Sequence, residues 1–159
     1  MEVTIFKDIK ETAQPFYRGV DFILHRIKNG ASKELVKRIR AEKDKEKLNK
    51  LKQNLPAICF SGKFSKRTDN SLMHHSGLIC LDFDGYEKNR DMLQEKERMS
   101  KNKYVYSVFI SPSGKGLKVL VRIPSIPENH KSYFNSLEKH FGSDYFDKTC
   151  KNLSRVCYE

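Results

Sequence analysis

Long apolar runs are missing from this chain of 159 residues. Nowhere do about 18 apolar residues follow one another, as a membrane-spanning helix requires. The N-terminal residues alternate polar and apolar types, so no signal peptide is expected. The chain also lacks an internal repeat and a low-complexity linker, which leaves a single domain over residues 1–159 as the expectation. The protein is expected to be cytoplasmic and to make no membrane contact.

Cysteine is sparse, and its spacing is uninformative for metal binding. The chain has Cys59, Cys80, Cys150 and Cys157, and no two of them form the short paired spacing of a zinc site. Cys59 and Cys80 lie inside apolar runs, where a free thiol behaves as a small core residue. The pattern excludes a structural zinc site of the finger type and predicts reduced thiols in an intracellular protein.

Acidic residues are fewer than basic ones, 20 against 31, and the formal net charge is +11. Residues 1–70 hold 17 Lys and Arg against 9 Asp and Glu, so most of the excess lies in the first half. A positive field attracts polyanions and favours a nucleic-acid or nucleotide partner without choosing between them. A solubilising surface on a Lys-rich chain explains the same charge equally well.

The N-terminal part, residues 1–56, is expected to be mainly helical. Apolar residues predict a short strand at 3–6, and their spacing predicts a helix over 20–28. Ser32 stands where an N-cap would begin a polar helix, or a pair of helices, that ends before Pro56.

The C-terminal part, residues 57–159, is expected to form the catalytic sheet. Apolar runs predict strands over 57–60, 77–83, 104–110 and 117–123, and helical spacing predicts helices over 86–101 and 127–141. The predicted fold class is α+β, with one sheet and helices packed on one of its faces.

Two aspartates mark the end of the second of these strands. Asp82 and Asp84 occupy alternate positions, so both side chains are expected on the same face. Two close carboxylates repel each other unless a cation lies between them. Mg²⁺ or Mn²⁺ held by carboxylates and phosphate oxygens is the usual arrangement. The alternative is an acidic pair in a turn, with one member capping the next helix.

A basic, glycine-containing loop follows at residues 111–118, between two predicted strands. Its glycines allow backbone amides to approach a phosphate, Ser113 offers a hydroxyl, and Lys115 and Lys118 offer charge. The loop is not an ATPase P-loop, because the glycine spacing is too short and a strand follows it. An ordinary hairpin turn is the alternative.

Two further charged residues complete a candidate site. Asp147 is a third carboxylate, and Arg155 can donate two hydrogen bonds to a phosphate or a base. Two metals held by three carboxylates would align a 3′ hydroxyl with the α-phosphate of a nucleotide and stabilise the pyrophosphate leaving group. The basic loop would then hold the β- and γ-phosphates.

These motifs, in this order, resemble motifs one, two and three of the archaeo-eukaryotic primase superfamily. The chain has Asp-x-Asp at a strand end, then a Ser-Gly-Lys-Gly-Leu hairpin, then a later Asp followed by Arg-Val-Cys-Tyr. The branch that it resembles most is the primase-polymerases related to the N-terminal domain of virulence-associated protein E, which includes CRISPR-associated members. The resemblance extends upstream to residues 55–64 and to Ser76-Gly77.

This resemblance implies an RRM-like catalytic sheet and metal-dependent, DNA-templated nucleotidyl transfer that starts and extends primers. The partners implied are a single-stranded DNA template, dNTPs or NTPs, and CRISPR-associated or helicase proteins. The metal-binding and catalytic positions carried over are Asp82, Asp84 and Asp147. The nucleotide-binding positions carried over are Ser113, Gly114, Lys115, Gly116, Lys118 and Arg155. Contacts to the template or to the nucleotide that have less support are Lys63, Arg67, His74 and His75.

Lys118 departs from the motif, because many members of that superfamily have His at this position. A lysine neutralises a phosphate but cannot titrate near pH 7.

Two other functions fit parts of the pattern. A haloacid-dehalogenase-like phosphohydrolase also has Asp-x-Asp-Gly after a strand, with the first Asp as nucleophile. In this chain most of the helical residues precede Asp82, and the loop 111–118 would have no role. A non-catalytic nucleic-acid-binding module would use the basic charge and stack bases on Tyr104, Tyr106 and Phe109.

Overall fold

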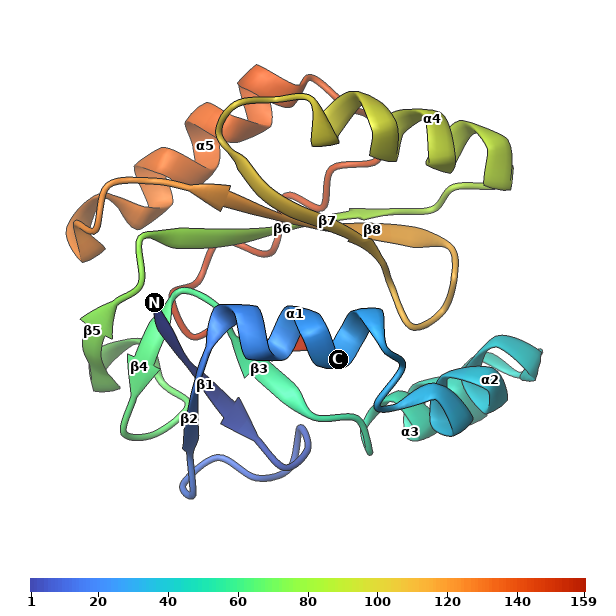
Figure 1. Cartoon of the computed structure of the whole chain (residues 1–159), viewed down its shortest axis with the longest axis horizontal. Helices are drawn as coiled ribbons and strands as arrows, with labels where there is room; N and C mark the ends of the chain where they lie inside the picture. Colours follow the sequence, from blue (N-terminus) through green and yellow to red (C-terminus); the bar gives the residue numbers. More distant parts are fainter.

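The computed structural model describes all residues 1–159 and confirms the α+β class (Figure 1). No helix combines the length and the apolarity needed to cross a membrane. The strands are β1 (Glu2–Phe6), β2 (Phe16–Gly19), β3 (Ala57–Cys59), β4 (Gly62–Phe64), β5 (Leu72–His75), β6 (Leu78–Asp84), β7 (Val105–Ile110), β8 (Gly116–Arg122) and β9 (Cys157–Tyr158). The α-helices are α1 (Val20–Lys28), α2 (Lys33–Ala41), α3 (Lys45–Lys52), α4 (Asn89–Ser100) and α5 (His130–Phe141), with short 3-10 turns at Asp69–Ser71 and Pro127–Asn129.

A three-stranded antiparallel sheet of order β6-β8-β7 runs through the middle of the molecule (Figure 1). Its strands are the predicted ones at 77–83, 104–110 and 117–123. One face carries Leu81 and Phe83, which pack against Met92 and Met99 of α4 and Phe134 of α5. Two of the predicted helices, α4 and α5, therefore cover this face of the sheet.

The opposite face of this sheet is buried as well. Leu78 and Leu120 pack there against Ile23 of α1 and against Ile58 and Phe60. In β6 and β8, apolar side chains occur at both odd and even positions, so apolar groups project from both faces of the sheet. A strand that is buried on two faces has such a continuous apolar run in its sequence.

The expectation of a single sheet is wrong, because the strand predicted at 57–60 belongs elsewhere. Strand β3 lies in a separate four-stranded sheet of order β2-β1-β3-β9, where Thr4 is paired with Cys59. Strands β4 and β5 form a further two-stranded sheet. Apolar alternation predicts that a segment is a strand, but it does not specify the partner of that strand.

Helices α2 and α3 form the pair that was one of the two options for residues 32–55. The break comes after Ala41, and Asp44 caps α3 by accepting the N–H of Lys47 at 2.8 Å. Ile39 is the single buried residue of α2, and α3 has none. The hairpin thus stands at the edge of the core with most of its surface in solvent.

The C-terminal segment connects the two layers. Phe146 forms a β-bridge with Phe83 at the free edge of β6. On either side of this bridge the N–H of Asp84 donates to the carbonyl of Tyr145 at 2.8 Å, and the N–H of Asp147 donates to the carbonyl of Asp82 at 2.9 Å. The rings of Phe83 and Phe146 meet edge to face at 5.2 Å. Apolar packing on one side of the strand therefore fixes Asp147 beside Asp82.

All four cysteines are free thiols. Cys59 is fully buried in β3, and burial raises its pKa to about 12. Its behaviour as a core residue agrees with the sequence pattern, because a thiol with that pKa stays protonated and unreactive.

Candidate metal and nucleotide site

Asp82 is a buried carboxylate in the middle of the molecule, with 4% of its surface exposed. Lys118 lies directly opposite it on β8, and the Lys118 ammonium is 2.7 Å from Asp82 Oδ2. Burial by itself lowers the pKa of Lys118, but the charge of Asp82 outweighs it and the pKa is raised. The lysine therefore stays charged, and the two residues form a buried ion pair.

Asp147 stands beside this pair. Its Oδ1 accepts the N–H and the hydroxyl of Thr149 at 2.9 and 2.7 Å, and its Oδ2 accepts the thiol of Cys150 at 2.8 Å. Burial opposes ionisation, but these hydrogen bonds and the charge of Arg155 outweigh it and lower the pKa of Asp147. Arg155 Nη2 lies 3.5 Å from Asp82 Oδ2 and 3.9 Å from Asp147 Oδ2.

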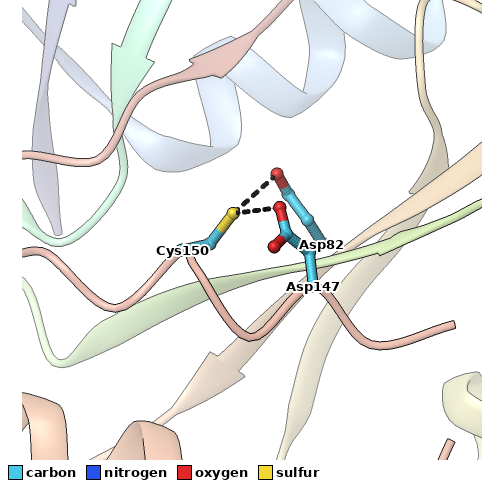
Figure 2. A group of neighbouring side chains, drawn as sticks. All are labelled: Asp82, Asp147 and Cys150. Atoms are coloured by element: carbon cyan, nitrogen blue, oxygen red, sulfur yellow. Dashed lines mark hydrogen bonds between the residues drawn. The ribbon is translucent and has the colours of Figure 1, made fainter. Parts of the chain in front are cut away.

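The group of Asp82, Asp147 and Cys150 has the composition of a metal site (Figure 2). One ligand atom from each lies within 4.8 Å of the others, and the Cys150 thiol points between the two carboxylates. Carboxylate oxygens suit Mg²⁺ and Mn²⁺, and a thiolate would favour the softer Mn²⁺. Burial and the charge of Asp82 raise the pKa of Cys150, so the thiol donates hydrogen bonds until a cation displaces its proton. The donor set fits one divalent cation.

Asp84 lies outside this group. It shares a sheet face with Asp82, as predicted, since their cross-strand partners are Gly116 and Lys118. Two residues along a strand span about 7 Å, however, and the Asp84 side chain is exposed at the end of β6. Its carboxylate lies over Gly116, where any Cβ would collide with Oδ1. A metal-binding role for Asp84 stays a prediction.

The loop over residues 111–116 is a tight hairpin fixed next to the carboxylates. The N–H of Ser111 donates to Gly116 at 2.8 Å, and that of Gly114 donates to Ser111 at 2.9 Å. Gly114 has φ +76°, a conformation that glycine adopts without strain. The N–H of Tyr86 donates to the carbonyl of Lys115 at 3.2 Å, which ties the loop to the turn that follows Asp84.

The predicted nucleotide-binding residues are thus divided between two environments. Ser113, Gly114 and Lys115 are in the loop, where the Lys115 side chain is exposed and the Ser113 hydroxyl lies 3.0 Å from that of Ser111. Lys118 is inside β8 and already neutralises Asp82. Of the two lysines, Lys115 is the one whose charge is free to meet a phosphate.

Three residues near the site were not found by sequence reasoning. Cys150 joins the carboxylates, and its only sequence signal is its position three residues after Asp147. Arg40 Nε of α2 donates to the carbonyl of Pro112 in the loop at 3.3 Å. Burial lowers the pKa of Lys52 in α3, and the charges of Asp84 and Asp82 partly offset this, which places Lys52 within reach of their field.

His75, predicted with less support to contact the template, is held inside the fold. Its Nδ1 accepts the N–H of Gly77 at 3.0 Å, so its proton is on Nε2 and points at His130 Nδ1, 3.1 Å away. His130 is 2% exposed, and burial lowers its pKa to about 4. His75 also has a pKa lowered by burial. The pair is neutral and links β5 to the start of α5.

We expect the stability of the protein to fall as the pH drops from about 6.5 towards 4. The unfolded chain then takes up protons that the folded His130 cannot, which costs about 3 kcal/mol in total. Urea unfolding between pH 7.5 and pH 5 measures about 2 kcal/mol of this loss, because the rest comes below pH 5. His130→Gln should have a flatter pH dependence, with His75 accounting for the rest, and an unchanged slope would contradict the assignment.

The comparisons with known proteins give one positive result. The family model described as BT4734-like, N-terminal domain, matches residues 50–159, and the chain belongs to that family. Searches of curated proteins and of solved structures gave no match. The assignment to the archaeo-eukaryotic primase superfamily is therefore wrong. It rested on short motifs, and an acidic strand end or a glycine hairpin recurs on unrelated folds because each is a local solution to anion or metal binding.

Proposed function

We propose that this member of the BT4734-like N-terminal domain family is a nucleotidyltransferase that joins nucleotides on a single-stranded DNA template. The reaction would be attack of a 3′ hydroxyl on the α-phosphate of a dNTP or NTP, with release of pyrophosphate. One observation carries the proposal. The edge pairing of Phe146 with Phe83 brings the Asp147 carboxylate to Asp82, and Asp82 contacts the cations of both Lys118 and Arg155.

The metal in this proposal is Mg²⁺ or Mn²⁺, held by Asp82 and Asp147 with Cys150 as a further donor. Such an ion supplies charge neutralisation for the nucleotide phosphates and for the leaving group. Asp84 is the one other carboxylate on this sheet face near the loop, and we propose it as the ligand that a second ion would need.

The remaining groups act on charge and position. Lys118 balances the charge of Asp82, so that the carboxylate remains ionised in a buried place. Arg155 is 43% exposed in its side chain, which leaves donors available for a phosphate. Lys115 and the amides of the hairpin loop would receive the outer phosphates. These roles together make a polyanion site rather than a neutral-ligand pocket.

The proposal also includes a specific fold for the catalytic part, an RRM-like sheet. The elements β6, α4, β7, β8 and α5 follow the order of a split βαβ unit, and Phe146 takes the place of a fourth strand beside β6. In such an arrangement β6, which carries Asp82, lies between the Phe146 segment and β8.

The two alternative functions have less support. A haloacid-dehalogenase-like enzyme is built on α/β wrapping with parallel strands, whereas β6 is paired antiparallel, and Asp82 is occupied by Lys118. A base-stacking module needs exposed aromatic residues on the sheet. Phe109 instead packs against Phe60, and the Tyr106 hydroxyl is bonded to Asp21. Tyr104 is exposed, but it precedes β7 and is a single aromatic residue.

The test is an incorporation assay with labelled dNTPs or NTPs, unprimed and primed single-stranded DNA, and Mn²⁺ or Mg²⁺. We expect dinucleotides and extended primers that disappear when the metal is chelated. Release of phosphate from a small phosphomonoester without any such product would establish the hydrolase instead. Metal-independent DNA binding with neither activity would establish the binding module.

A further inference from the structure

The hairpin of α2 and α3 is the most positively charged helical part of the molecule. Residues 33–52 contain nine Lys and Arg against four Asp and Glu, whereas α4 has three of each and α5 has two against one. Of these nine cations only Lys37 forms an ion pair, with Glu34. Eight of the nine are exposed and Lys52 is half-buried, so most of the charge is presented to solvent instead of being neutralised within the fold.

A groove of about 570 Å³ lies between the two helices. Its cations are Arg38, Lys47 and Lys50, all exposed and none of them in an ion pair. Glu42 is the one acidic residue of the lining, and its carboxylate accepts the N–H of Asp44 at 2.8 Å. The groove thus offers three free positive charges to an anionic ligand.

We propose that this groove binds the sugar-phosphate backbone of a single-stranded nucleic acid. The choice of a strand as partner rests on the proposed function. The hairpin also touches the loop of the proposed catalytic site, because Arg40 Nε of α2 donates to the carbonyl of Pro112 at 3.3 Å. Figure 1 shows both helices beside the tip of the β7–β8 hairpin, so a strand in the groove would be close to the site.

The composition of the surface favours a nucleic acid over a membrane. None of the large exposed apolar side chains of the protein belongs to residues 33–52, so the hairpin has no apolar face to insert into lipid. It has no aromatic residue for base stacking either. Recognition therefore depends on phosphate contacts, which are independent of sequence and sensitive to salt. The eight residues of α3 span about 12 Å, which suits a short stretch of flexible strand.

The test compares two double variants that each remove two exposed, unpaired lysines. Lys47→Gln/Lys50→Gln changes the groove, and Lys131→Gln/Lys139→Gln changes α5 on the far side of the central sheet. Binding of a fluorescent single-stranded oligonucleotide of mixed sequence is measured by anisotropy at several salt concentrations, with EDTA and without nucleotide. The groove variant should bind about tenfold more weakly, and its salt slope should fall by about 1.4, at about 0.7 per lost phosphate contact. The α5 variant should stay within about twofold of the wild type.

Three outcomes would overturn the proposal. Wild-type affinity in the groove variant, an equal loss in both variants, or no binding by the wild-type protein would each do so. Binding of vesicles of phosphatidylcholine and phosphatidylserine in place of the oligonucleotide, lost in the groove variant, would assign the surface to a membrane. The binding measurement uses neither metal nor catalytic turnover. Its result therefore tests the groove even if the protein proves to have no nucleotidyltransferase activity. Thermal unfolding of both variants checks that they remain folded.

Discussion

Asp147→Asn should lower the rate of nucleotide incorporation about a thousandfold. The substitution removes one of the two carboxylate charges that would hold the cation, and it keeps the size of the side chain. Losing about 4 kcal/mol of metal-derived transition-state stabilisation corresponds to three orders of magnitude in rate. Single-turnover primer extension with Mn²⁺ and with Mg²⁺ measures the effect.

Asp144→Asn is the matched control for this variant. Asp144 is an exposed carboxylate three residues earlier in the same segment, and it makes no ion pair or hydrogen bond with the site. We expect it to retain the wild-type rate and the wild-type urea midpoint, whereas Asp147→Asn should remain folded with a somewhat lower midpoint because it loses the charge that Arg155 faces. A wild-type rate in Asp147→Asn, or an equal loss in Asp144→Asn, would remove Asp147 from the site.

Asp82→Ala should destabilise the fold as well as abolish activity. The carboxylate is the partner of the Lys118 ammonium, whose side chain is 11% exposed. Removing one member of a buried ion pair leaves an uncompensated charge and typically costs about 3 to 5 kcal/mol. The free energy of unfolding in urea should fall by that amount, and activity measured on this variant alone therefore cannot separate a catalytic role from a structural one.

A second substitution separates the two roles. Asp82→Ala/Lys118→Met replaces the pair by apolar groups, and we expect it to recover most of the lost stability because no buried charge remains. Arg155, the other cation near Asp82, is partly exposed and can turn towards solvent. The double variant should be folded and inactive. A double variant as unstable as the single one would show that Asp82 stabilises the protein by some other contact.

The sequence indicated part of the candidate site because one residue and one loop of it have local signals. Asp82 follows an apolar run, and the loop at 111–116 combines glycine, serine and lysine between two strands. Cys150 and Lys52 have no comparable signal. The position of Cys150 depends on the path of the C-terminal segment, and that of Lys52 depends on how α3 packs. Local sequence spacing predicts neither.

The Asp82 and Asp84 pair shows the same limit. Alternation along a strand placed both on one face, which is correct. Which of the two lies near a third carboxylate depends on Phe146, which packs on Phe83. This packing places Asp147 beside Asp82 and not beside Asp84. Local spacing determines orientation, whereas a cluster of ligands requires segments far apart in the chain to meet.

The sequence by itself determined the α+β class, the three central strands with their two covering helices, the polar pair at 32–55 as helix, and the basic excess. Each of these follows from hydrophobic periodicity, capping residues or charge, which are local properties. Only the tertiary structure decided that β3 pairs with β1, that Lys118 forms an ion pair with Asp82, and that His75 is hydrogen-bonded to His130. These are choices among long-range partners, and packing and the burial of charge settle them.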